Sequence, residues 1–240
     1  MLDHVTIRVS GLEASRRFYA TVLDREPVGS EYSEWDDFSI APAEHDRPVT
    51  RHLHVGFAAR SRDEVDAFWR RGTDAGYPSD GEPGLRVQYD PDYYGAFLLD
   101  PDGNSIEAMH RAPRTESGPQ IDHLWVGVSD LAASRRFYET IAPVLGLEVG
   151  EGDIPDYVFV GSGGRHVALV ADGRRPTEHL HLAFPAVDDE TVAEFHRVAT
   201  AAGYRDNGGP GERPQYHPGY VGAFVLDPDG NNVEAVNHNR

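Results

Sequence analysis

Hydrophobic and polar residues alternate along several short stretches of the chain, which is the pattern of a β-strand with one buried face. The clearest such stretches are residues 2–9, 51–58, 123–128 and 178–184. A segment with apolar residues at helical spacing follows each of them. Ser10 and Glu13 have the spacing of a capping box, as do Ser61 and Glu64, so helices are expected to begin there. The alternating stretches are therefore predicted to be strands that lead into helices.

Shorter strand candidates follow the helices, and each half of the chain ends in a predicted hairpin. The hairpin turn is Asp-Pro-Asp-Gly at residues 100–103 and again at residues 227–230. Proline at the second position and glycine at the fourth are typical of a type I turn. Strands outnumber helices, so the pattern predicts an α+β fold in which each half forms a curved mixed sheet with helices on its convex side.

The second half of the chain repeats the first. Asp3-His4-Val5 returns as Asp122-His123-Leu124, an offset of 119 residues (123 − 4), and the later matches have an offset of 127 (234 − 107). A repeat of this length predicts two domains of ordinary size. We expect a first domain at residues 1–111, a linker at residues 112–120 that contains two prolines and a glycine, and a second domain at residues 121–240.

Composition narrows the classes of function. The net charge is −18, which disfavours nucleic acid and acidic membrane surfaces as partners. No apolar run is long enough to cross a bilayer and the N-terminus lacks the layout of a signal peptide, so a cytoplasmic protein with a small-molecule partner is expected. There is no cysteine and all 22 basic residues are arginine, which excludes thiolate and lysine chemistry. Monomer and homodimer both remain open.

Successive side chains of a strand point to opposite faces of the sheet, and this alternation identifies the candidate metal-binding residues. His4, His54 and Glu107 each lie on the strand face that the apolar residues do not use, and His123, His181 and Glu234 repeat this in the second half. Two histidines and a carboxylate match the ligands of a divalent-metal site with open positions. The predicted ion is Fe²⁺, Mn²⁺, Zn²⁺, Ni²⁺ or Co²⁺.

These motifs together resemble the vicinal oxygen chelate superfamily, which includes glyoxalase I, bleomycin-resistance proteins and extradiol dioxygenases. The resemblance rests on Asp-His in the first strand, His-x-(Gly/Ala)-Phe in the later one, and Asp-Pro-Asp-Gly-x-x-x-Glu in the hairpin. It implies two tandem domains, each built from two βαβββ modules. It also implies one metal triad of His4, His54 and Glu107 and another of His123, His181 and Glu234. The sequence leaves open whether each triad is completed within one half or by strands exchanged between the halves.

The sequence departs from the patterns of individual family members, and these departures narrow the reactions that it can be expected to catalyse. The run at residues 38–41 and its counterpart at 167–170 lack the additional glutamate of glyoxalase I. In extradiol dioxygenases a histidine and then a tyrosine precede the hairpin; here the histidine is His217, but the tyrosine position is Phe224. Loss of that hydroxyl removes a possible acid and weakens a ring-cleaving role.

Tyr216 and His217 are the candidate catalytic residues, because only the second half has a histidine at this place. His52 and His179 are further histidines near the predicted ligands. The resemblance implies a metal-dependent isomerase, lyase or dioxygenase whose substrate chelates the metal through neighbouring oxygens. The alternative is a non-catalytic small-molecule binding or drug-sequestering resistance protein.

Overall fold

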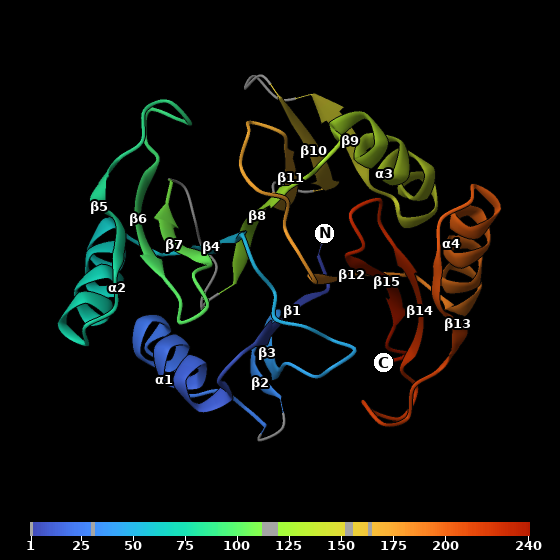
Figure 1. Cartoon of the computed structure of the whole chain (residues 1–240), viewed down its shortest axis with the longest axis horizontal. Helices are drawn as coiled ribbons and strands as arrows, with labels where there is room; N and C mark the ends of the chain where they lie inside the picture. The colour runs from blue at the N-terminus through green and yellow to red at the C-terminus, as the bar shows by residue number, and fades with distance from the viewer. Residues whose placement is uncertain (1, 30–31, 112–119, 152–155, 163–164) are drawn as a thin grey trace. The chain divides into compact units, whose positions relative to one another are not determined.

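A computed structural model describes residues 2–29, 32–111, 120–151, 156–162 and 165–240. Within them the chain forms two mixed sheets, of seven and eight strands, and four helices (Figure 1). This α+β architecture confirms the predicted fold class. The expected linker lies almost wholly outside the described residues. None of the described helices combines the length and apolar character that a membrane crossing requires.

The seven-stranded sheet has the order β13-β14-β15-β12-β1-β3-β2 in the described part of the chain. Its strands are β1 (His4–Val9), β2 (Ser33–Trp35), β3 (Phe38–Pro42), β12 (His181–Pro185), β13 (Asp206–Glu212), β14 (Val221–Leu226) and β15 (Asn232–Asn237). β1 runs antiparallel to β12, with His4 opposite Ala183, and β12 runs parallel to β15.

The eight-stranded sheet has the order β5-β6-β7-β4-β8-β11-β10-β9 among the described residues. Its strands are β4 (Leu53–Ala58), β5 (Ser79–Leu85), β6 (Tyr94–Leu99), β7 (Ser105–His110), β8 (Ile121–Gly127), β9 (Glu148–Glu151), β10 (Tyr157–Ser162) and β11 (Arg165–Val170). β4 runs parallel to β7, as β12 does to β15.

The chain divides into two compact units whose boundaries fall inside the first strand of each half. One unit comprises Met1–Thr6 and Trp125–Arg240, and the other comprises Ile7–Leu124. The beginning of β1 therefore belongs with the second half of the chain, and the beginning of β8 belongs with the first. This exchange of strand ends decides which ligands meet.

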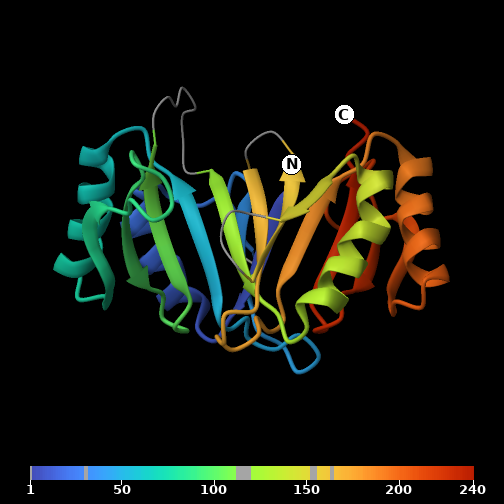
Figure 2. The ribbon, with the colours of Figure 1, turned by 90° about the horizontal axis from the view of Figure 1, so that it is seen from above.

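Four helices cover the sheets in the described residues: α1 (Leu12–Leu23), α2 (Arg62–Asp74), α3 (Leu131–Leu145) and α4 (Asp189–Ala201). In one unit α2 packs on β5, β6 and β7 and against α1; in the other α4 packs on β13, β14 and β15 and against α3 (Figure 2). Phe57 packs on Phe38, which contacts Tyr19 of α1, and Phe184 contacts Tyr138 of α3. The helices thus cover the apolar strand face, and the opposite face carries the predicted ligands.

The capping predictions have different outcomes. Ser61 is the N-cap of α2 and accepts a hydrogen bond from the backbone of Glu64, as predicted. The Ser10 prediction is wrong, because Gly11 precedes α1 and no side chain caps it. The backbone N–H of Ser10 instead donates to the carboxylate of Asp102 in the hairpin turn, at 2.9 Å. The first hairpin therefore holds the chain where it enters α1.

Candidate metal centres

The first cluster, called the His54 cluster, consists of His54 on β4, Glu107 on β7 and His123 at the beginning of β8. Nε2 of His54 lies 3.1 Å from Oε2 of Glu107 and 3.2 Å from Nε2 of His123. Nε2 of His123 is 3.4 Å from the same carboxylate oxygen. All three residues are buried.

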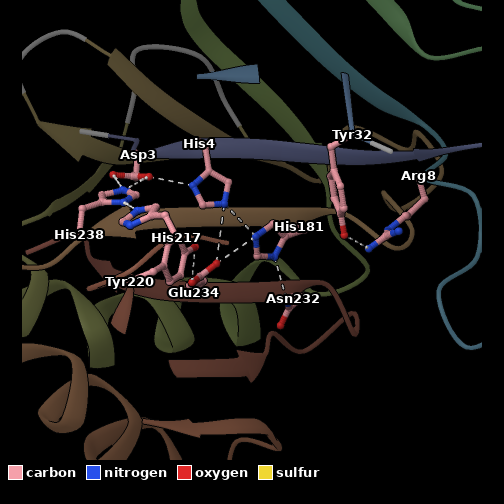
Figure 3. Close-up of polar contacts among 10 residues, drawn as sticks. All are labelled: Asp3, His4, Arg8, Tyr32, His181, His217, Tyr220, Asn232, Glu234 and His238. Atoms are coloured by element: carbon pink, nitrogen blue, oxygen red, sulfur yellow. Dashed lines mark hydrogen bonds and ion pairs between the residues drawn. The ribbon is translucent and has the colours of Figure 1, made fainter. Parts of the chain in front are cut away.

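The second cluster, called the His4 cluster, consists of His4 on β1, His181 on β12 and Glu234 on β15 (Figure 3). The Nε2 atoms of His4 and His181 are 3.2 Å apart, and they lie 3.7 Å and 3.1 Å from Oε2 of Glu234. Glu234 is buried, but both histidines are partly exposed. The two clusters share their chemistry and differ in their access to solvent.

All six predicted ligands thus lie in clusters, but the grouping that the family resemblance implied is wrong. His4 does not join His54 and Glu107; it joins His181 and Glu234. His123 correspondingly joins His54 and Glu107. The reason is the exchange of strand ends, since β1 pairs with β12 and brings His4 to the second half's ligands.

The donor set fits a divalent cation. Donors about 2.0–2.2 Å from an ion and at right angles to one another are about 3 Å apart, which is close to the spacing in both clusters. Each cluster contains three residues in the part of the chain described, and each residue offers one donor atom. The three donor atoms of a cluster lie within 4.8 Å of one another. Burial acts to raise the pKa of Glu107, but hydrogen bonds from His123 and His54 outweigh it and lower the pKa to about 2. The carboxylate is therefore an anionic donor at neutral pH.

Outer residues orient the histidines of the His54 cluster. The Ser105 hydroxyl donates to Asp80 at 2.7 Å, so its oxygen accepts from Nδ1 of His54 at 3.1 Å. Nδ1 of His123 lies 3.0 Å from a carboxylate oxygen of Asp122. Once Nε2 gives up the proton that it donates to Glu107, the proton held on Nδ1 leaves the Nε2 lone pair directed at the cluster centre, as a metal ligand requires. The His54 cluster is therefore preorganised for an ion.

The outer residues of the His4 cluster are different. Asp3 accepts from Nδ1 of His4 at 2.8 Å, as its counterpart does in the other cluster. Asn232, however, stands where the first half has Ser105, and it directs its amide nitrogen at Nδ1 of His181, 2.7 Å away. Its oxygen accepts from Asn207 at 2.9 Å. A half-turn of the Asn232 amide is needed before His181 can hold its proton on Nδ1 and offer Nε2 to a metal.

A tyrosine holds the ligand carboxylate in each cluster. Tyr93 donates to Oε1 of Glu107 at 2.9 Å, and Tyr220 donates to Oε1 of Glu234 at 2.7 Å. Burial, followed by the neighbouring carboxylate, raises the pKa of both phenols, so they remain donors. Sequence reasoning missed this pair, although both tyrosines precede the hairpin at the same offset of 127 (220 − 93).

The predicted catalytic residues lie beside the His4 cluster. Tyr216 is 48% exposed and its ring packs on Tyr220, with centroids 4.9 Å apart. His217 also contacts Tyr220 and hydrogen-bonds to His238, with 2.9 Å between the two nitrogens. His52 and His179 precede their strands with φ values of 59° and 58° and belong to neither cluster.

In each cluster the ring of one histidine lies beside a phenylalanine, and an arginine is stacked on that phenylalanine. The Phe97 ring is 5.8 Å from that of His54, and the Arg86 guanidinium lies over it at 5.2 Å. Arg86 donates to the backbone oxygens of Glu82 and Leu85 and forms no ion pair with the residues described. The counterparts in the His4 cluster are Phe224, 6.2 Å from His181, and Arg213 at 5.4 Å. Each of these phenylalanines thus carries an arginine that forms no ion pair with the residues described.

Comparison with known proteins identifies the family of the chain and supports its fold. A model of the family described as "Glyoxalase/Bleomycin resistance protein/Dioxygenase superfamily" matches residues 1–108 and 120–235. Glyoxalase I from Zea mays is similar in structure over 99% of this chain and 92% of its own, with a TM-score of 0.72 and 21% identity. A putative dioxygenase from Bacillus subtilis subsp. subtilis str. 168 is similar over 98% and 84%, with a TM-score of 0.65 and 17% identity. At these identities the likeness concerns the fold alone. No curated protein matches the chain.

Proposed function

Because the chain belongs to the Glyoxalase/Bleomycin resistance protein/Dioxygenase superfamily, we propose that it is a divalent-metal-dependent enzyme that acts on a small substrate through neighbouring oxygens. The observation that carries the proposal is the doubled His/His/Glu cluster, with donor atoms 3.1–3.4 Å apart at the His54 cluster. Three ligands on one side of an ion leave positions for two substrate oxygens. We favour isomerase or lyase chemistry over ring cleavage.

The bound ion would act as a Lewis acid that polarises the substrate oxygens. The protein's own residues hold the ligands in place. Asp3 keeps the His4 proton on Nδ1, and Tyr220 holds one oxygen of Glu234 so that the other faces the histidines. Rigid ligands of this kind give an ion a fixed position against the substrate.

The arginines next to the clusters favour an anionic substrate. Arg86 and Arg213 carry permanent charges over Phe97 and Phe224, and in the described structure their guanidinium groups donate to backbone oxygens and form no ion pair. A guanidinium recognises a carboxylate or phosphate in two parallel hydrogen bonds. We propose that this cation binds an acidic group of the substrate and that Phe97 and Phe224 contact its apolar part.

Ring cleavage is the less favoured reaction, because in both clusters a phenylalanine occupies the place beside one of the histidines. Phe97 and Phe224 supply only carbon atoms there. The nearby phenols of Tyr93 and Tyr220 already donate to the ligand carboxylates. We retain Tyr216 as a proposed substrate contact, because it is half-exposed beside Tyr220.

Metal content tests the first part of this proposal. Protein stripped with a chelator and reloaded with Zn²⁺, Mn²⁺ or Co²⁺ should bind two ions per chain. His54→Ala and His181→Ala should each lose one ion, and the double variant should lose both. His196→Ala, which changes a histidine paired with Asp206 outside the clusters, is the control. Two ions retained in both single variants would remove the proposal.

Turnover tests the second part. Loaded protein should act on small α-hydroxycarbonyl compounds that carry a carboxylate, and Arg213→Met should raise KM for these more than for uncharged analogues. With Fe²⁺ and catechols, no oxygen uptake is expected. Sustained catechol-dependent oxygen uptake would instead identify a dioxygenase.

A further inference from the structure

A chain of hydrogen bonds leads from His4 to a pair of histidines near the surface (Figure 3). Asp3, which binds Nδ1 of His4, also contacts Nε2 of His238 through both carboxylate oxygens, each at 3.1 Å. Nδ1 of His238 lies 2.9 Å from Nε2 of His217, and Nδ1 of His217 lies 2.8 Å from the carbonyl oxygen of Pro218. The two rings stack with centroids 5.2 Å apart.

The partners of the two rings determine how many protons the pair holds. A carbonyl oxygen only accepts, so Nδ1 of His217 carries a proton. The Asp3 carboxylate also accepts, so Nε2 of His238 carries a proton. If both rings were neutral, two lone pairs would face each other across 2.9 Å. One additional proton turns that contact into a hydrogen bond and gives the pair a charge of +1.

The His54 cluster has no such pair. The residue that corresponds to His238 is Arg111 (238 − 127), and the residue that corresponds to His217 is Asp90 (217 − 127). Arg111 lies 3.7 Å from Asp122, the counterpart of Asp3. Arginine keeps its charge at all physiological pH values, whereas imidazole gains or loses its charge near neutrality. The same place thus holds an arginine beside the first cluster and a pair of hydrogen-bonded imidazoles beside the second.

We propose that His217 and His238 share one proton opposite Asp3 and that metal binding at the His4 cluster releases this proton, whereas the His54 cluster with Arg111 has no equivalent. The proton places a positive charge one carboxylate away from the metal ligand His4. Its loss leaves Asp3 uncompensated and strengthens the attraction of the cluster for a cation. Metal binding and proton release are coupled in both directions.

The groups that face the pair are consistent with this assignment. They are Asp3, which directly precedes β1, and Tyr220 from the segment before β14, whose ring contacts both imidazoles. His4 bonds to Asp3 on its other side, and Tyr216 and Glu234 contact Tyr220. No arginine contacts either ring in the described structure, and Asp3 is the carboxylate that bonds to the pair. The shared proton is therefore the compensating charge for Asp3 on this side of the cluster.

The shared proton can be tested without any metal. In protein labelled with ¹⁵N-histidine, NMR at neutral pH should show three protonated nitrogens in the His217–His238 pair and a single step in which the middle proton is lost as the pH rises. His217→Gln should abolish that step. A pair that holds only two protons throughout the titration would overturn the inference.

The coupling rests on the proposed function, since it requires that the cluster binds metal. Calorimetric Zn²⁺ titrations in two buffers of different ionisation enthalpy count the protons released on binding. They are done in a His54→Ala background, in which only the His4 cluster keeps its three residues. Compared with the parent, His238→Arg should release up to one proton fewer per Zn²⁺ bound. Its Zn²⁺ affinity should also increase less steeply with pH than that of the parent, by a factor of up to about ten per pH unit. His196→Arg, at a surface His–Asp pair, is the matched control and should behave as the parent.

The possible outcomes separate the two proposals. Failure of the parent protein to bind Zn²⁺ would contradict the proposed function, while the NMR result would decide the shared proton independently. Equal proton release by the parent and by His238→Arg would overturn the coupling. If His238→Arg does not fold, His217→Gln supports the same comparison, because it replaces one of the two rings that share the proton with an amide that cannot hold it.

Discussion

Gly56 lies directly against the imidazole ring of His123: a Cβ atom at residue 56 would be 2.2 Å from Cε1 of that ring. The corresponding residue in the second half is Ala183 (56 + 127), which lies opposite His4 in the strand register. The His4–Glu234 distance, 3.7 Å, exceeds the corresponding His123–Glu107 distance of 3.4 Å. The absence of a side chain at Gly56 is thus what lets His123 approach its strand at the His54 cluster.

Gly56→Ala should therefore displace His123 and weaken metal binding at the His54 cluster. Overpacking of a buried site costs about 1–3 kcal/mol, which corresponds to roughly a tenfold or greater loss of Zn²⁺ affinity. Competition with a chromogenic chelator measures the change. Ala183→Gly is the complementary variant and should leave the His54 cluster unaltered. Unchanged affinity in Gly56→Ala would show that the ring shifts at no cost.

Ser105→Ala should reduce metal affinity at the His54 cluster by about 10- to 100-fold, the usual effect of losing an outer hydrogen bond to a ligand histidine. The hydroxyl accepts from Nδ1 of His54, and alanine leaves that nitrogen without its acceptor. A His181→Ala background isolates this cluster in the titration. Ser79→Ala, which changes a serine bonded to Trp69 instead, serves as the control.

Asn232→Asp should have the opposite effect at the His4 cluster. A carboxylate accepts from Nδ1 of His181 in either orientation, so no half-turn of an amide is needed before Nε2 can bind an ion. We expect Zn²⁺ affinity to rise about tenfold, measured in the His54→Ala background. A fall in affinity would contradict the assigned role of Asn232.

Two corresponding buried tyrosines should respond differently to loss of the hydroxyl. Tyr19 donates to Asp100 at 2.9 Å, whereas the Tyr138 hydroxyl has no hydrogen-bond partner in the described structure. Tyr19→Phe should lower the free energy of unfolding by about 1.5–3 kcal/mol, and Tyr138→Phe should leave it nearly unchanged or raise it. Urea unfolding of both variants provides the measurement, and equal losses would be inconsistent with these contacts.

The missing hydrogen bond from Tyr138 also bears on pH. Burial raises the pKa of Asp227 from 3.8 to about 6, while hydrogen bonds from Asn231 only partly oppose it. The folded state thus holds this proton more tightly than the unfolded state. The resulting stabilisation is complete below pH 4 and is lost as the pH rises through about 6.

Asp227→Asn should remove this pH dependence. The difference in unfolding free energy between the parent and the variant should change by on the order of 2–3 kcal/mol between pH 4 and pH 7, with the parent relatively more stable at low pH. Urea unfolding at several pH values measures it. A difference that stays constant with pH would be evidence against a raised pKa for Asp227.

Much of the fold, and the strand face that carries all six residues of the two clusters, could be predicted from the alternation of side chains, which places His4, His54 and Glu107 opposite the residues that pack under helices. The strands β5 and β13 were not predicted. Their sequences, SDGEPGL and DNGGPGE, are rich in glycine and proline, and they pair with β6 and β14 only through irregular registers. Hydrophobic pattern carries no signal for such strands.

The grouping of the ligands could not be predicted for a different reason. His4 and His123 have the same local sequence and the same parity, so local pattern cannot distinguish the partners of one from those of the other. Only the pairing of β1 with β12 does so, and strand pairing between distant segments leaves no trace in a single sequence. The outer residue His238 was missed because its contact with Asp3 depends on that pairing.

Each cluster takes one histidine from the opposite half of the chain, and this limits how the polypeptide can be cut into fragments that keep a complete cluster. Separated at residues 112–119, the N-terminal fragment would keep His4, His54 and Glu107 but would lack a complete triad, and its C-terminal counterpart would be equally deficient. Two such fragments would acquire binding capacity only by reassociating. Duplication of an ancestral half would then have joined in one polypeptide what previously required two molecules.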